Sequence, residues 1–150
     1  MAHQAKSPTL EELRERIRSK GLRVTAPRVA VLQSLGRTGA PASHAELAAT
    51  LASQGWDRAT IYRNLIDLTE AGLVSRTDLG DHTWRFEVLA EGRAHDAAEH
   101  PHFLCDACGD VLCLPDGSVQ VNPARGAPRA FRKRRIQIQI KGRCDRCVGA

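Results

Sequence analysis

The chain has 150 residues, 42% of them hydrophobic and 26% charged, and a net charge of +5. This composition predicts one globular domain or two small ones and excludes a disordered chain, while the length excludes a barrel enzyme. No run approaches the roughly 18 apolar residues of a membrane span, and the N-terminus lacks the apolar core of a signal peptide, so we expect a cytoplasmic protein without a membrane partner.

Four short helices are predicted in the first 75 residues. Capping boxes at Thr9/Glu12 and Ser43/Glu46 indicate the starts of the first and third helices, and Pro27 suits an early turn of the second. Glycines indicate where each helix ends. The predicted helices span residues 10–20, 27 to the glycines at 36 and 39, 44–55, and 58–71.

The hydrophobic period changes from helical to alternating after these helices. Residues 73–79 and 82–89 predict a hairpin joined at Gly80-Asp81, a dipeptide that tolerates the positive φ of tight turns. Helices followed by a two-stranded hairpin predict a winged helix-turn-helix domain over residues 1–89. The polar residues 90–99 predict a hinge.

A second domain is predicted over residues 100–150. HPHFLC, VLCLP and RRIQIQIKG are candidate strands, and Pro123, Gly126 and Pro128 disfavour a long helix between the last two. This half is therefore a small sheet. The fold class is α+β, with a winged helix-turn-helix domain followed by a small α/β domain.

Two matched cysteine pairs dominate the second domain, Cys105-x-x-Cys108 and Cys144-x-x-Cys147. A two-residue gap lets both sulfurs of a turn converge on one tetrahedral metal. Four thiolates leave no open position for water, so the pattern predicts a structural zinc site. Buried unligated cysteines and a dithiol redox pair are the alternatives. Cys113 lies outside the pairs, where a buried strand cysteine is the default.

A histidine pair comes just before the first cysteine pair. His100 and His102 are two residues apart in a predicted strand, so both imidazoles leave the same face and can share one ion. The alternative is that they are surface residues of the sheet and bind no metal.

Five motifs in this order resemble the ferric uptake regulator (Fur) family of bacterial metal-dependent repressors. They are GLRVTAPR, RATIYRNLIDLTEAGLV, RFE, HPHFLCDACG and GRCDRC, spread over residues 10–148. The resemblance implies that the first domain binds double-stranded DNA, that the second forms a homodimer, and that a regulatory metal lies between them. Its implied ligands are His44, Glu87, His100 and His102.

The resemblance also bears on the metal. Nitrogen and oxygen ligands suit Fe(II), Mn(II) or Zn(II). Zinc-responsive relatives tend to have a cysteine at the position of Glu87 and peroxide-sensing relatives an aspartate, so Glu87 favours iron. Cys113 replaces an acidic residue that completes the site in many members. It either leaves the site four-coordinate, joins it as a thiolate that favours zinc, or makes it sensitive to oxidation.

By the same resemblance the fourth helix reads DNA, in an A·T-rich palindromic operator. Tyr62 can contact a thymine methyl, Arg63 a base edge or phosphate, and Arg23 the minor groove, whereas Arg28 is an expected phosphate anchor. The predicted DNA-binding residues are Arg23, Arg28, Arg58, Thr60, Tyr62, Arg63 and Asn64.

The expected function is an iron-sensing repressor that binds its operator as a metal-loaded homodimer. The alternatives are a peroxide-sensing or a zinc-uptake repressor on the same fold, or a DNA-binding module with structural zinc only. An enzyme is not expected, because no nucleophile motif, phosphate loop or general-base pair accompanies the metal ligands.

Overall fold

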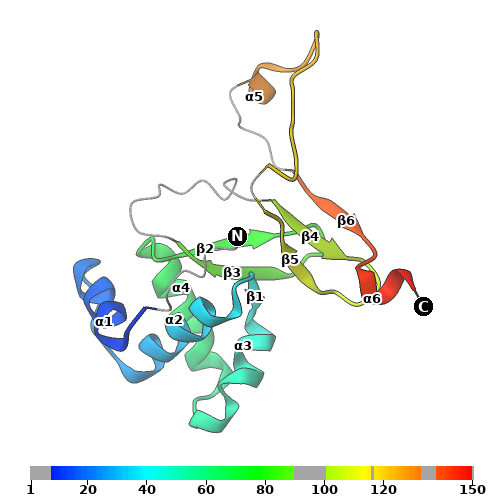
Figure 1. The fold of residues 1–150 in the computed structure, drawn as a ribbon. Helices are drawn as coiled ribbons and strands as arrows, with labels where there is room; N and C mark the ends of the chain where they lie inside the picture. The colour runs from blue at the N-terminus through cyan, green and yellow to red at the C-terminus, as the bar shows by residue number, and fades with distance from the viewer. Residues whose placement is uncertain (1–7, 90–100, 116, 133–137, 150) are drawn as a thin grey trace. The chain divides into compact units, whose positions relative to one another are not determined.

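The computed structural model of the chain describes residues 8–89, 101–115, 117–132 and 138–149 (Figure 1). The contacts divide the chain into an N-terminal unit, Met1–His95, and a C-terminal unit, Asp96–Ala150. The predicted hinge, residues 90–99, lies outside the described residues.

Four α-helices begin the N-terminal unit, and all four were predicted from the sequence. They are α1 (Leu10–Ser19), α2 (Ala26–Thr38), α3 (His44–Thr50) and α4 (Arg58–Glu70), with a 3₁₀ helix η1 (Ala52–Gln54) after α3. Of the two glycines expected to end α2, Gly36 continues the helix and Gly39, with a φ of 62°, ends it.

The helix starts are held by side-chain caps. The two predicted capping boxes are confirmed: Thr9 with Glu12 starts α1, and Ser43 with Glu46 starts α3. A third cap escaped the sequence analysis. At the start of α4 the backbone N–H of Thr60 donates to Asp57 Oδ1 at 2.6 Å, and this bond holds the pKa of the Asp57 carboxyl below its usual value.

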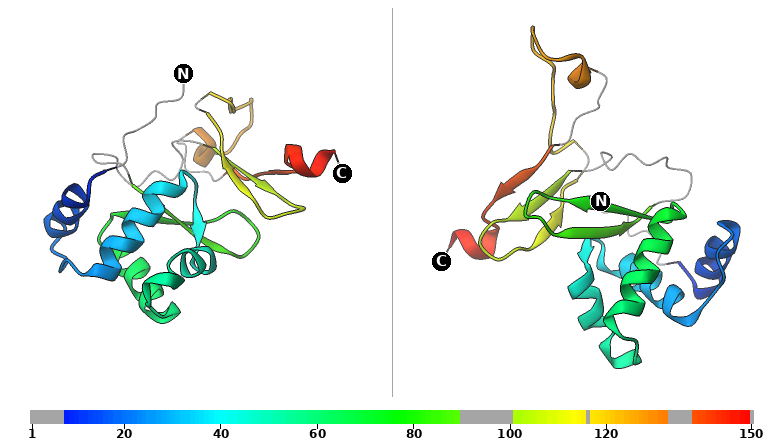
Figure 2. Two further views of the ribbon diagram at one scale, coloured as in Figure 1. Left: turned by 60° about the horizontal axis from the view of Figure 1, so that its bottom comes forward. Right: turned by 180° about the vertical axis from the view of Figure 1, so that it is seen from behind.

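An antiparallel sheet in the order β1-β3-β2 completes the N-terminal unit. The predicted hairpin is confirmed as β2 (Val74–Asp78) and β3 (Trp84–Val88), whereas β1 (Ala42–Ser43) was not predicted, because two residues carry no periodicity. Figures 1 and 2 show α2, α3 and α4 against one side of this sheet. The strand β1 thus joins the start of α3 directly to the hairpin.

The expected turn at Gly80-Asp81 was wrong in detail. The connection between the strands runs from residue 79 to 83, and the positive φ values fall on Gly80 and His82 rather than on Asp81. Asp78 explains the longer loop, because its carboxylate accepts the backbone N–H groups of Gly80 at 2.7 Å and His82 at 3.1 Å.

The core of the N-terminal unit forms where the helices meet the sheet. Its largest fully buried side chain is Phe86 in the central strand β3, which pairs with Ala42 of β1 and Arg76 of β2. Helical residues at three- and four-residue spacing close around it. The other fully buried large side chains of this unit are Leu13, Ile17, Val31, Leu32, Leu47, Ile61, Leu65, Leu68 and Val74.

One buried cation lies beside Phe86. Arg85 is 6% exposed, and its guanidinium donates two hydrogen bonds of 2.8 Å each, one to each carboxylate oxygen of Asp81. Arg85 thereby holds the pKa of the Asp81 carboxyl below its usual value, with a smaller contribution from the Thr83 N–H. This ion pair ties the hairpin loop to its own strand.

We expect Asp81→Asn to lower the free energy of unfolding of the N-terminal unit by about 2 kcal/mol at neutral pH, because the buried Arg85 cation then has no anion beside it. The loss is smaller than for a fully buried pair, because water partly screens the exposed Asp81 carboxylate in the unmodified protein. The pKa of Asp81 is lower in the folded state, so the stabilisation is complete above the unfolded value of about 4 and is lost as the pH falls through the folded value. Urea titrations followed by the helical circular dichroism measure both.

The control variant is Glu11→Gln, which removes exposed ion pairs of α1 with Arg14 and Arg18 and should leave the stability unchanged. A loss in Asp81→Asn that is equally large well below pH 4 would contradict the role of the Asp81 charge.

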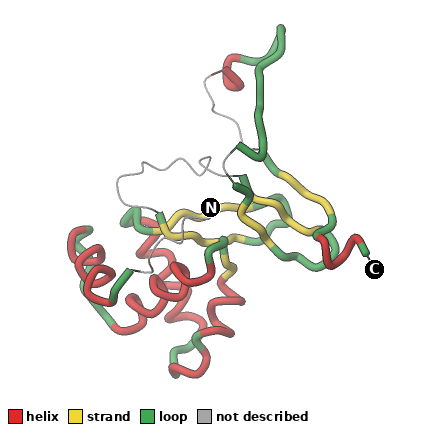
Figure 3. Tube along the Cα trace, in the orientation of Figure 1, coloured by secondary structure: helices red, strands yellow, loops and turns green. Residues whose placement is uncertain are grey.

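Strands make most of the regular structure in the C-terminal unit (Figure 3). The sheet order is β5-β4-β6, with β4 (His102–Cys105) antiparallel to β5 (Val111–Cys113) and parallel to β6 (Ile140–Gly142). Each predicted strand is confirmed but shorter than expected. Residues 134–137 of the third lie outside the described residues.

Two short helices accompany this sheet, α5 (Arg129–Arg132) and α6 (Asp145–Val148). As expected, the described residues before the third strand contain no long helix, and α5 accounts for four of them. Figures 1 and 2 show α5 on an extended excursion away from the strands, whose residues 117–126 are exposed. In the described parts of both units, no helix is long and apolar enough to cross a bilayer.

Candidate metal and nucleic-acid sites

The four paired cysteines come together in the C-terminal unit. Cys105 ends β4, Cys108 follows in the turn, Cys144 precedes α6 and Cys147 lies within it. Their four Sγ atoms all lie within 4.8 Å of one another, and Cys108 Sγ is 3.8 Å from Cys144 Sγ. Zinc–sulfur bonds of about 2.3 Å at tetrahedral angles place sulfurs about 3.8 Å apart. The cluster therefore fits a tetrahedral zinc ion.

Backbone pairing holds the two halves of this cluster together. Cys105 is the register partner of Gly142, and the N–H of Asp106 donates to the Gly142 carbonyl at 2.9 Å. The N–H of Cys144 points at Cys105 Sγ at 3.4 Å. The parallel ladder of β4 and β6 thus brings two distant turns to one point.

The thiols of the cluster differ in acidity. Backbone N–H groups, first that of Cys144 and then that of Cys108, lower the pKa of Cys105 to about 6. Contacts with the neighbouring thiols, first Cys144 and then Cys108, raise the pKa of Cys147 to about 12. Cys105 is therefore the first of these thiols to deprotonate as the pH rises, and a bound cation would favour deprotonation of the others.

The predicted regulatory ligands are spread over both units. Glu87 lies in β3 opposite Ser75, and His102 begins β4 opposite Cys113 of β5. Register partners on antiparallel strands point to the same face, so His102 and Cys113 offer one imidazole and one thiol to the same side of the sheet. His100 lies outside the described residues.

His44, the fourth predicted ligand, is the first residue of α3 and packs within the N-terminal unit. Its Nε2 donates to the backbone carbonyl of Arg58 at 2.8 Å. Its ring meets that of Tyr62 edge to face, with centroids 5.4 Å apart and an interplanar angle of 66°. Sequence spacing carried no sign of this contact, which depends on how α3 packs against α4.

The predicted DNA-binding residues of α4 divide between two faces. Arg58, Tyr62 and Arg63 are exposed and Thr60 is half-buried. Asn64 is only 7% exposed, and its side-chain amide donates to the Thr60 carbonyl at 2.8 Å. Asn64 therefore belongs to the packed face of the helix.

Arg28 is committed to a contact inside the N-terminal unit. Its guanidinium donates to the carboxylate of Asp67 in α4 and to the carbonyl of Arg23 at 2.6 Å, and the side chain is 11% exposed. The partner was missed in the sequence, because 39 residues separate the pair. Arg28 thus fixes α2 to α4, while Arg23 remains exposed.

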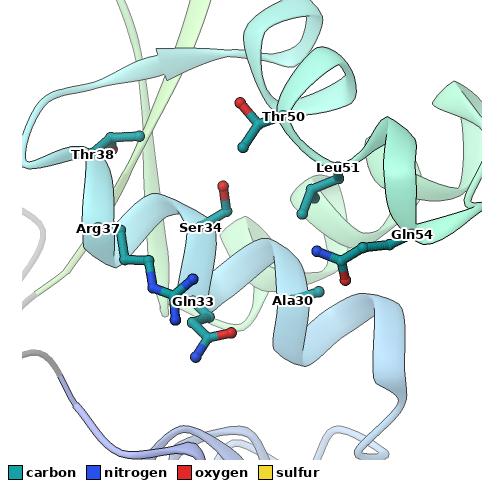
Figure 4. A pocket seen from close by; sticks show the side chains of 8 residues that line it. All are labelled: Ala30, Gln33, Ser34, Arg37, Thr38, Thr50, Leu51 and Gln54. Carbon is teal, nitrogen blue, oxygen red and sulfur yellow. The ribbon is translucent and has the colours of Figure 1, made fainter.

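A pocket of about 270 Å³ lies between α2 and the segment from α3 to η1 (Figure 4). Arg37 carries its only formal charge, and the rest of the lining is small, aliphatic, hydroxyl or amide. None of the predicted site residues that the structure describes lines it. The lining residues are Ala30, Gln33, Ser34, Arg37, Thr38, Thr50, Leu51 and Gln54.

Comparisons with known proteins agree with this fold. The model of the ferric uptake regulator family matches residues 19–140. The ferric uptake regulation protein of Legionella pneumophila is 34% identical over 138 residues, covering 89% of this chain and 96% of its own. The peroxide operon regulator of Bacillus subtilis is 26% identical over 141 residues, 92% of each chain.

Solved structures share the fold. The ferric uptake regulator of Helicobacter pylori superposes with a TM-score of 0.67 at 20% identity, over 98% of this chain and 99% of that one. A zinc uptake regulator complexed with zinc and DNA has the same fold. With the family model covering most of its length, this chain belongs to the ferric uptake regulator family. Members of this family are transcriptional regulators responsive to metals.

Proposed function

We propose that this protein is a metal-responsive transcriptional repressor that binds an A·T-rich palindromic duplex as a metal-loaded homodimer. The observation that carries the proposal is the exposed start of α4. Arg58, Tyr62 and Arg63 project from a helix whose other face, including Ile61 and Leu65, is buried. Such a helix, with α3 before it and the β2–β3 hairpin after it, supports the proposal of a winged helix-turn-helix.

Each exposed residue has a role that its chemistry suits. The N-terminal turns of α4 would enter the major groove, where Tyr62 meets a thymine methyl and Arg63 a base edge or phosphate. Arg23 would enter the minor groove, and Arg58 and Thr60 would contact the backbone. Asn64 and Arg28 are left out of this surface, because their side chains are engaged inside the unit.

Exposed positive charge supports this surface. Within the described parts of the chain, none of Arg23, Arg58 and Arg63 forms an ion pair with a carboxylate, in contrast to the engaged cations Arg28 and Arg85. Free guanidinium groups are the donors that phosphate oxygens attract most strongly. Binding to DNA should therefore weaken steeply as the salt concentration rises.

The proposed homodimer is supported by apolar residues of the C-terminal unit that remain partly exposed to solvent. Large exposed hydrophobic residues cost solubility in a monomer, and an interface with a second copy would shield them from water. These residues are Leu112, Val119, Val121, Ile138 and Val148.

The regulatory metal is proposed to take ligands from both units, Glu87 from the N-terminal one and His100 and His102 from the C-terminal one. An ion with these ligands would favour one angle between the units and so one spacing of the two α4 helices in the dimer. Glu87 makes Fe(II) the favoured effector, with Mn(II) and Zn(II) as rivals. His44 is assigned another role below.

Cys113 supports a second candidate, a zinc- or oxidation-responsive regulator. It is the register partner of His102, so its thiol lies on the face of the sheet that presents a proposed ligand. A thiolate in the shell would favour zinc over iron and give oxidants a target.

Operator binding tests the proposal. We expect the zinc-loaded protein to bind an A·T-rich palindrome about 5- to 150-fold more tightly after Fe(II), Mn(II) or Zn(II) is added, a range typical of coupled sites. His102→Ala should abolish this gain, because it removes a metal ligand. Fluorescence anisotropy in buffered metal, without oxygen for Fe(II), measures the affinity.

His82→Asn, which changes an exposed loop histidine, is the matched control and should retain the metal response. An affinity that metal does not change in the unmodified protein would contradict the proposal. Cys113→Ser decides between the two candidates. If it leaves the iron and zinc responses and the response to peroxide unchanged, iron sensing stands, and if it removes the zinc response or the sensitivity to peroxide, the second candidate replaces it.

A further inference from the structure

We propose that His44 is a positioning residue of the DNA-reading helix α4, and not a ligand of the regulatory metal. The inference rests on the proposed function, because it assigns Tyr62 and the first turn of α4 to DNA. It starts from two contacts that His44 makes with α4, one to Arg58 and one to Tyr62.

The first contact fixes the backbone. Arg58 is the first residue of α4, and its carbonyl accepts the Nε2–H of His44 at 2.8 Å. Because a carbonyl can only accept, the ring proton must sit on Nε2. The same carbonyl accepts the Tyr62 N–H within the helix, so His44 ties α3 to the turn that presents Arg58 and Tyr62.

The second contact holds the Tyr62 side chain, which is proposed to contact a DNA base. Tyr62 is 47% exposed, and the His44 ring meets it edge to face at 5.4 Å. Edge-to-face pairs are favourable, so His44 restricts the rotation of the Tyr62 ring about its side-chain bonds. A ring already held in one orientation loses less conformational entropy when it meets a base.

Two observations argue against metal ligation by His44. It belongs to no group of three or more described residues whose potential ligand atoms lie within 4.8 Å of one another. A metal binds an unprotonated ring nitrogen, and Nε2 carries the proton that the Arg58 carbonyl accepts, so only Nδ1 is left for a metal. Ligation through Nε2 would break this bond and release the first turn of α4. His44 therefore acts on the DNA side of the protein.

Operator affinity and metal affinity, measured together, separate these roles. We expect His44→Ala to weaken binding of the metal-loaded protein to the palindrome about tenfold, since it removes one hydrogen bond and one aromatic contact. Its affinity for Mn(II), measured by calorimetry on the zinc-loaded protein, should stay unchanged. His102→Ala should weaken Mn(II) binding directly, because it removes a proposed metal ligand. Its DNA affinity should fall only as a consequence of that lost metal.

Two conservative variants divide the contacts. His44→Gln keeps a side-chain donor near the position of Nε2 but loses the ring, whereas His44→Phe keeps the ring but loses the donor. Each should restore part of the affinity lost in His44→Ala. A variant that lost affinity only through poor folding would show a matching fall in thermal stability, which is measured for every variant, with His82→Asn as the control histidine.

A spectroscopic signal reports the contact directly. Tyr62 is the only tyrosine in the sequence, so tyrosine labelled with carbon-13 at Cζ alone gives a single resonance. We expect this resonance to shift in His44→Ala and not in His82→Asn, because only His44 lies against the ring.

Three results would overturn the inference: unchanged DNA affinity in His44→Ala, weakened Mn(II) binding in that variant, or an unshifted Tyr62 resonance. Failure of the proposed function looks different, since the unmodified protein would then show no metal-dependent DNA binding while the Tyr62 resonance would still report His44.

Discussion

Cys144→Ser will lose zinc and unfold the C-terminal unit while the helices of the N-terminal unit stay folded. The four sulfurs lie within 4.8 Å of one another, and the small sheet around them has few fully buried side chains besides Cys105. Structural zinc contributes about 10–16 kcal/mol of apparent binding free energy in small zinc domains. No other interaction described in this unit approaches that value.

Metal analysis and limited proteolysis measure this result. The unmodified protein should contain about one zinc per chain and Cys144→Ser almost none, because three thiolates do not close the tetrahedral shell. Proteolysis should then digest the C-terminal unit and leave an N-terminal fragment with the helical circular dichroism of the intact protein.

Cys113→Ser is the matched control, a cysteine of the same unit outside the cluster. It should retain zinc. Zinc that persists in Cys144→Ser, or zinc lost equally from Cys113→Ser, would contradict the assignment of the four paired cysteines.

The second large effect is expected in the N-terminal core, where Phe86→Ala should lower the free energy of unfolding by about 3–5 kcal/mol. Phe86 is 1% exposed and lies in the central strand, between β1 and β2 and beneath the helices. Its removal leaves a cavity that the surrounding leucines cannot fill without moving the strands. Urea unfolding followed by helical circular dichroism measures the loss.

Trp84→Ala provides the control on the same strand. Trp84 is 51% exposed and contacts chiefly the Arg76 guanidinium, whose central carbon lies 4.3 Å from the ring centroid. Losing that contact should cost less than about 1 kcal/mol. Equal losses in Phe86→Ala and Trp84→Ala would show that Phe86 does not anchor the core.

The sequence predicts those parts of the fold that depend on neighbours along the chain. Thr9 and Ser43 cap helices through residues three positions away, and the alternating pattern around Phe86 marks a strand. The strand β1 and the pair of Arg28 with Asp67 were not predicted, because both depend on residues far apart in sequence.

In the candidate sites, too, the sequence predicts what depends on neighbouring residues and misses what depends on residues far apart in the chain. The Cys-x-x-Cys spacing alone predicted the cysteine cluster, since each pair forms within one turn and two pairs complete a tetrahedron. The roles of His44, Arg28 and Asn64 depend on helix packing. Residue type marks all three as polar, and only the fold reveals that His44 and Arg28 contact α4 and that Asn64 lies on its packed face.

The parallel ladder of β4 and β6 also bears on the order in which the protein folds. Antiparallel β4 and β5 can close as a local hairpin, but β6 must return from the far side of the exposed excursion, a long and entropically costly closure. The helices of the N-terminal unit need no such search. Newly made chains that lack zinc would therefore accumulate with a folded N-terminal unit and an unfolded C-terminal unit, which proteases can attack until zinc binds.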